Sequence, residues 1–79
     1  MVLQPKYLVA EINSIASIPV KRLNNADWRN MGRIADQLQI LNVIRPTQRS
    51  NLAAISHRVS AGLACMPDIA LILDEVRNW

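Results

Sequence analysis

Four prolines, at positions 5, 19, 46 and 67, divide the 79-residue chain into segments. Each proline stands just ahead of a run in which apolar residues recur at helical spacing. Proline holds φ near the helical value and lacks an N–H that the first turn of a helix leaves unpaired, so it favours helix starts. The apolar run at 69–73 could also be a buried strand, but nothing else in the chain offers it a partner. The sequence therefore predicts an all-α fold, a small bundle of four to five short helices.

The apolar stripes give the expected positions of these helices, because residues that recur every three or four positions lie on one helix face. In the third segment the stripe consists of Leu52, Ile55, Val59, Leu63 and Met66. The expected helices lie near residues 5–17, 26–40, 48–64 and 67–77, with a short turn at 19–23.

Polar residues and glycines indicate how the helices begin and end. Asn24 and Asn25 are a good N-cap pair, because an Asn side chain accepts hydrogen bonds from the free N–H groups of a first turn. Thr47 or Ser50 could cap the third helix, and Gly62 is expected to weaken its last turns. Gly32, inside the second helix, costs about 1 kcal/mol relative to Ala. We interpret it as a point of close packing against another backbone rather than as a hinge.

Length and composition limit the class of protein. Seventy-nine residues make a single domain, 1–79, and 24 of them are Leu, Ile or Val. A chain of this size buries only about 60% of its unfolded surface, so self-association would widen a thin stability margin. The longest charge-free stretches, 12–20 and 59–67, are nine residues each, whereas a membrane span needs about 20. Since no signal peptide is visible, we expect a cytoplasmic protein.

Few residues could carry chemistry. Cys65 is the only cysteine, which excludes an intramolecular disulfide, and with His57 it cannot supply the four ligands of a zinc site. On one continuous helix these two residues would stand about 12 Å apart, too far for a nucleophile and its base. We expect Cys65 in the core and His57 on the surface. Asp74 and Glu75 diverge by about 100° on a helix and form no acid–base pair. The sequence predicts no enzyme, metal or cofactor.

The basic residues leave nucleic-acid binding open. Net charge is +3, with +5 over residues 1–67 and −2 over residues 68–79. Arg reads guanine edges, Gln and Asn read adenine edges, and a recognition helix carries such residues near its start. A helix-turn-helix would place 33–38 on the support helix, but Gln39 stands where a turn usually has glycine. The candidate nucleic-acid-binding residues are Arg45, Gln48, Arg49, Asn51 and Arg58.

The last segment favours a protein-binding surface. Its core stripe is complete without Leu71, so this residue extends the apolar surface toward water, where contiguous apolar area is usually functional. Trp is enriched at protein interfaces, although a Trp at the chain end could equally dock onto its own domain. The candidate protein-interface residues are Ala70, Leu71, Asp74 and Trp79.

The prediction from these observations is a non-enzymatic regulator or inhibitor that binds another protein and forms a homo-oligomer, most simply a homodimer. The alternative is a small, dimeric, helix-turn-helix-like DNA-binding regulator. The sequence offers no membrane partner in either case.

Overall fold

The computed structural model describes residues 4–79 and consists of helices. In chain order they are α1 (Pro5–Ala16), a short 3-10 helix (Val20–Arg22), α2 (Asn25–Ile40), α3 (Pro46–Ser60) and α4 (Met66–Arg77). No strand occurs in this part of the chain. The predicted all-α bundle is confirmed, including the short turn near residues 19–23. The second helix begins at Asn25, one residue before the expected start, and of the two asparagines Asn24 is the N-cap.

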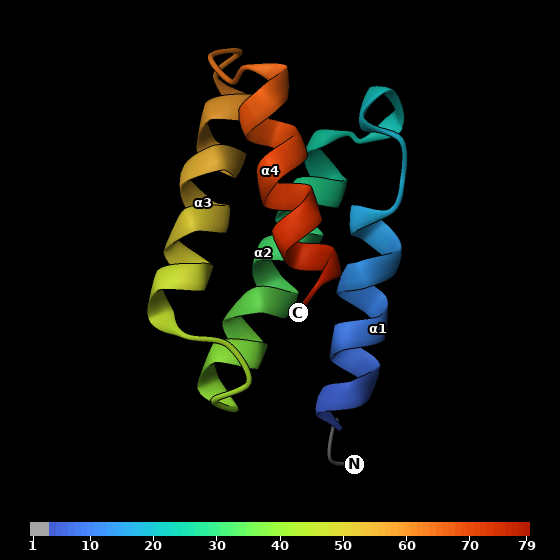
Figure 1. Ribbon diagram of the computed structural model, residues 1–79, viewed down its shortest axis with the longest axis vertical. Helices are drawn as coiled ribbons and strands as arrows, with labels where there is room; N and C mark the ends of the chain where they lie inside the picture. The colour runs from blue at the N-terminus through green and yellow to red at the C-terminus, as the bar shows by residue number, and fades with distance from the viewer. Residues whose placement is uncertain (1–3) are drawn as a thin grey trace.

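The four α-helices lie side by side, and each runs antiparallel to the one before it (Figure 1). α1 packs on α2, α2 on α3 and α3 on α4, and α4 closes the ring by packing against α1. Short connections hold this order: the α2–α3 and α3–α4 links each span five residues, 41–45 and 61–65. The bundle therefore has four sides, each formed by one pair of neighbouring helices.

Apolar side chains from all four helices fill the centre of the bundle. α3 is the least anchored helix, because Leu52 is its only fully buried side chain, while Ile55 and Val59 are partly exposed. The core is made of Leu8, Ile12, Ala16, Trp28, Met31, Ile34, Ala35, Leu38, Ile44, Leu52, Ile69, Ile72, Leu73 and Val76.

Local hydrogen bonds fix the helix ends. The Asn24 side chain accepts from the N–H of Asp27 at 2.9 Å, and the Asp27 carboxylate accepts from the N–H of Asn24 at 3.1 Å. This reciprocal capping box satisfies two N–H groups at the start of α2. Two residues beyond the ends of α2 and α3, the chain adopts the left-handed conformation, at Asn42 (φ 61°) and Gly62 (φ 73°).

Gly62 ends the third helix earlier than the apolar spacing predicts. The N–H of Leu63 donates to the carbonyl of Arg58 at 2.8 Å, which closes the helix in a Schellman-type turn. The expected extension to residue 64 is therefore wrong. Leu63 and Met66 do not continue the inner stripe, because the helical period stops at Ser60; they are 74% and 57% exposed.

Three further expectations are corrected. α3 begins at Pro46, and neither Thr47 nor Ser50 caps it; instead the Gln48 side chain accepts from the N–H of Arg45 at 2.7 Å. Cys65 is exposed and not part of the core, because it lies in the link before α4. No backbone packs closely on Gly32: a Cβ there would meet only the side chain of Arg49, at 4.0 Å.

The C-terminus docks back onto the bundle. Arg77 donates to the carbonyl of Ala16 at 3.0 Å, which satisfies one of the free carbonyls at the end of α1. Trp79 is partly buried and packs against the core. No helix among residues 4–79 combines the length and the apolar character needed to cross a bilayer.

Candidate functional site

A groove of about 560 Å³ lies between α3 and α4. Its base is apolar, and its two walls carry polar and charged side chains. It is lined by Asn51, Ala54, Ile55, Arg58, Asp68, Leu71, Ile72, Asp74 and Glu75. We call this the α3–α4 groove.

Leu71 is the main exposed apolar side chain of the groove. It is 70% exposed, whereas its neighbour Ile72 is only 5% exposed and belongs to the core. The two side chains differ because successive residues of a helix point about 100° apart. The expectation that the core stripe does not need Leu71 is thus confirmed. This exposed leucine lines the groove together with the partly buried Ile55.

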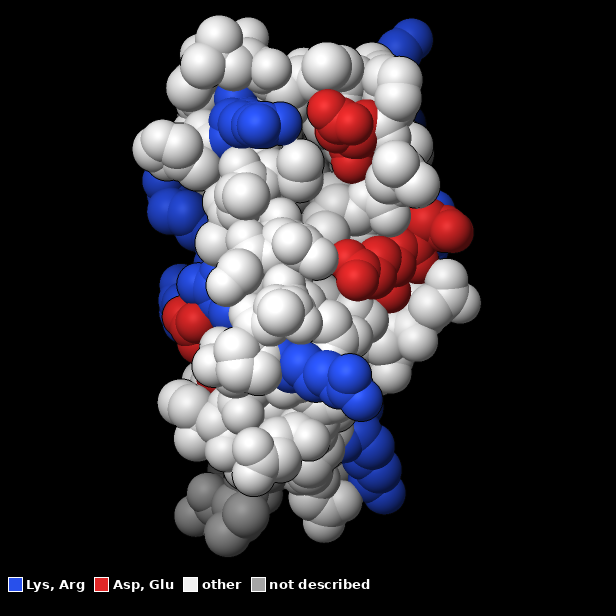
Figure 2. Space-filling model, turned by 60° about the vertical axis from the view of Figure 1, so that its left-hand side comes forward, with Lys and Arg blue, Asp and Glu red and all other residues white. Residues whose placement is uncertain are grey.

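The two walls of the groove carry opposite charges. The α3 wall has Arg58, and the α4 wall has Asp68, Asp74 and Glu75. Figure 2 shows this arrangement: acidic groups lie on the right of the forward face, and a basic group lies at the height of the upper one across a narrow uncharged strip. Asp74 is engaged by Arg77 at 3.5 Å. In the part of the chain that the structure describes, Arg58 and Asp68 form no ion pair.

The structure divides the predicted interface residues. Leu71 and Asp74 line the groove together. Ala70 is exposed and is not among the residues that line the groove. Trp79 packs against the core of its own domain, which is the alternative to an interface position that the sequence also allowed.

The predicted nucleic-acid-binding residues do not form one face. Asn51 and Arg58 line the α3–α4 groove, beside the predicted interface residues. Arg49 lies on the other side of α3, where it forms an ion pair with Asp36 of α2. The Gln48 side chain caps α3 by accepting from the N–H of Arg45, and Arg45 is the exposed residue directly before α3. Two of the five side chains are therefore engaged within the molecule.

Sequence reasoning missed Asp68, Glu75 and Ile55 as members of a site. In the sequence, Ile55 belongs to the apolar stripe of the third segment, and Asp68 and Glu75 belong to the acidic last segment. Their shared groove exists because α3 and α4 pack antiparallel. The signal that could have found them is the short link between the two helices, since short links join antiparallel neighbours.

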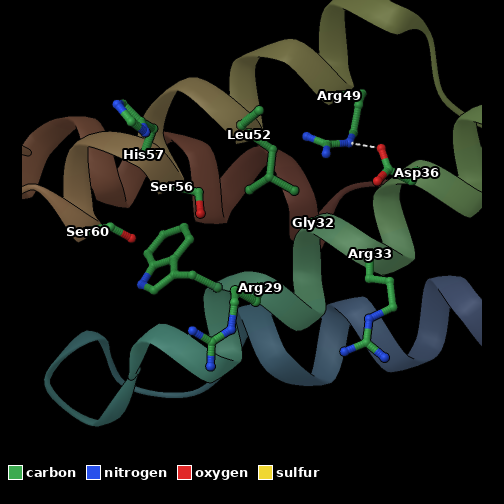
Figure 3. A pocket seen from close by; sticks show the side chains of 11 residues that line it. Arg29, Gly32, Arg33, Asp36, Arg49, Leu52, Ser56, His57 and Ser60 are labelled. Atoms are coloured by element: carbon green, nitrogen blue, oxygen red, sulfur yellow. Dashed lines mark hydrogen bonds and ion pairs between the residues drawn. The ribbon is translucent and has the colours of Figure 1, made fainter.

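A second hollow, of about 420 Å³, lies between α2 and α3 (Figure 3). Its lining includes the arginines Arg29, Arg33 and Arg49. Figure 3 shows Arg29 and Arg33 extending from α2 away from α3, while Arg49 is bonded to Asp36. The cationic groups do not converge on one point, so the hollow lacks the focused positive charge of an anion site.

The described residues hold no cluster of three or more His, Cys, Asp or Glu side chains that could bind a metal ion. His57 is exposed at the rim of the α2–α3 hollow, as expected, and Cys65 lies in the link beyond the end of α3. The α3–α4 groove gathers four of the nine predicted site residues, whereas the α2–α3 hollow contains one, Arg49.

Comparison with protein-family models, with curated proteins and with solved structures finds no match to this chain. By its fold and its surface, the molecule is an antiparallel four-helix bundle with a charge-flanked groove between α3 and α4.

Proposed function

We propose that this protein is a non-enzymatic interaction module, a small regulator or inhibitor that acts by binding protein through the α3–α4 groove. The observation that carries the proposal is Leu71, a leucine 70% exposed beside Ile55 and between walls of opposite charge. A large apolar side chain that the core does not need has a physical use when a partner covers it.

The energetics favour such a use. Covering a leucine side chain removes apolar area from water and contributes about 1.5–3 kcal/mol. Polar groups around an apolar centre exclude water and fix the orientation of a partner. Arg58 on one wall and Asp68 on the other supply that polar surround, and each is free to pair with a partner of opposite charge.

The test compares two adjacent aspartate substitutions. Leu71→Asp is expected to abolish association while circular dichroism stays helical, because the new charge stays exposed in the free chain. Ile72→Asp is expected to unfold the bundle, because it buries an unpaired charge. Association is measured by light scattering after size exclusion and by capture of partners from a nuclease-treated lysate.

Ala53→Asp is the matched control for surface charge. Ala53 is exposed on α3 but lines the α2–α3 hollow instead of the α3–α4 groove. This variant should associate as the natural chain does. If Leu71→Asp unfolds the chain as readily as Ile72→Asp, or if Ala53→Asp reduces association equally, the groove is not the binding surface.

Nucleic-acid binding is the second candidate, supported by the exposed Arg29 and Arg33 of α2, which form no ion pair within residues 4–79. It has less support, because Gln48 and Arg49 are engaged within the molecule. Even a non-specific binder is captured at low salt through phosphate contacts. A gel shift with duplex DNA at low salt tests this candidate, and the absence of a shift at micromolar protein would remove it.

A further inference from the structure

Six of the residues that line the α3–α4 groove form three pairs across it. α3 ends at Ser60, α4 begins at Met66, and the two helices run antiparallel. Because each residue advances about 1.5 Å along a helix, residues equally far from these two ends are expected at similar heights, and the six paired residues all line the same groove. The three pairs, at two, five and nine residues from Ser60 and Met66 respectively, are Arg58 with Asp68, Ile55 with Leu71, and Asn51 with Glu75.

The two members of each pair are chemically complementary, but groups that could bond or pack remain exposed to solvent. Arg58 and Asp68 have opposite charges, yet no ion pair joins them within the described residues. Ile55 and Leu71 are both apolar, and Leu71 is 70% exposed. An Asn amide can donate to a carboxylate such as that of Glu75. At these three levels one wall of the groove thus complements the other.

From this arrangement we propose that the protein that docks in the α3–α4 groove is a second copy of this chain, related by a two-fold axis parallel to the groove. The proposal rests on the proposed function, because it names the partner of the same surface. A rotation about such an axis exchanges the walls while it keeps the height of each residue. Arg58 of each copy then meets Asp68 of the other, and Asn51 meets Glu75.

The same rotation brings the apolar parts together. Leu71 of one copy is placed against Ile55 of the other, so the exposed leucine of each copy is covered in the same interface. The remaining acid on the α4 wall, Asp74, already has Arg77 beside it in its own chain. A contact of this kind is isologous and closed, so it gives a dimer and not a filament.

The available area suits a dimer. A stable interface buries about 800 Å² on each partner, which is about 15% of the 5300 Å² surface of this chain. One of the four sides of the bundle can supply that area. An arrangement in which another protein fills the groove would need a partner with its own acid and base at matching heights, whereas the second copy has them by symmetry.

The test uses charge reversal at the outer pair. Arg58→Glu places like charges at both symmetry-related contacts, and Asp68→Arg does the same with the opposite sign. Each variant alone is expected to dissociate at least about tenfold more readily than the natural dimer, since close interfacial charge pairs are strongly coupled. Circular dichroism verifies that both variants remain helical.

Mixing the two variants provides the decisive measurement. In a mixed dimer, Glu at position 58 faces Arg at position 68 across one contact, and the natural Arg58 and Asp68 face each other across the second. The mixture should regain the natural affinity, with a mass of twice 8.9 kDa by light scattering. If the groove bound a different protein instead, mixing the two variants would not restore binding, because the charges on that protein would still be mismatched with each variant.

Two results would overturn the proposal: a mass of 8.9 kDa for the natural chain up to about 1 mM protein, or a mixture no more dimeric than its components. The proposed function fails separately. If the chain is monomeric but Leu71→Asp loses a protein that Ala53→Asp still captures, the groove binds a foreign protein and only the second copy is refuted. If Leu71→Asp changes neither association nor capture, both proposals fall.

Discussion

Two leucines in this bundle provide a direct test of its packing, because the same substitution is expected to cost much stability at one and almost none at the other. Leu52 is fully buried and is the only such side chain on α3, whereas Leu71 on α4 is 70% exposed. Leu52→Ala and Leu71→Ala remove the same atoms. Any difference in the free energy of unfolding therefore reports the two environments.

The expected magnitudes are far apart. Truncating a fully buried leucine costs about 3–5 kcal/mol, because the transfer free energy is lost and a cavity remains. A surface truncation stays within about 0.5 kcal/mol. A domain of this length has a total stability of about 4–12 kcal/mol. Leu52→Ala therefore removes a large share of the stability and releases α3, the less anchored wall of the α3–α4 groove.

The assay is urea unfolding followed by circular dichroism and by the fluorescence of the buried Trp28, at protein concentrations too low for association. Thermal unfolding should show a fall in Tm of at least about 12 °C for Leu52→Ala, since 1 kcal/mol corresponds to about 4–8 °C in a domain of this size. For Leu71→Ala the Tm should hardly change. Equal losses in the two variants would refute the reasoning, because Leu71 would then be a core residue.

Two further predictions concern helix ends. Asn24→Ala removes one half of the capping box of α2 and should lower stability by about 1 kcal/mol in urea unfolding, with Asn25→Ala as the control; equal effects would contradict the cap assignment. Gly62→Ala forces a residue with a Cβ into the left-handed conformation at φ 73° and should cost about 1–2 kcal/mol. Because nothing lies within 4 Å of that Cβ, a neutral result would mean that the turn changes its conformation.

The helices could be predicted from the sequence because their signals are local. Proline before each apolar run and Asn24 before α2 act through their own φ angles and hydrogen bonds, which no distant residue needs to supply. The exposure of Leu71 was also predictable, since the core stripe of α4 was already complete without it.

The errors arose where a periodic pattern continued past a backbone signal. Leu63 and Met66 match the helical spacing, but Gly62 adopts φ 73° and turns the chain before they are reached. The same turn leaves Cys65 in the exposed link, although a free cysteine is usually buried. At the start of α3, Gln48 supplies the capping oxygen that was expected from Thr47 or Ser50.

The candidate site lay beyond sequence reasoning because it depends on register between two helices. The sequence shows a basic body and an acidic C-terminal segment, and from this alone Arg58 belongs with the other arginines and Asp68 with the acids of its own helix. Two local features set the register: Gly62 ends α3 at Ser60, and Pro67 lies in the first turn of α4. Antiparallel packing then brings Arg58 level with Asp68. The complementarity of the walls is thus encoded by the two residues that fix the helix ends, and it becomes visible only once the helices are packed.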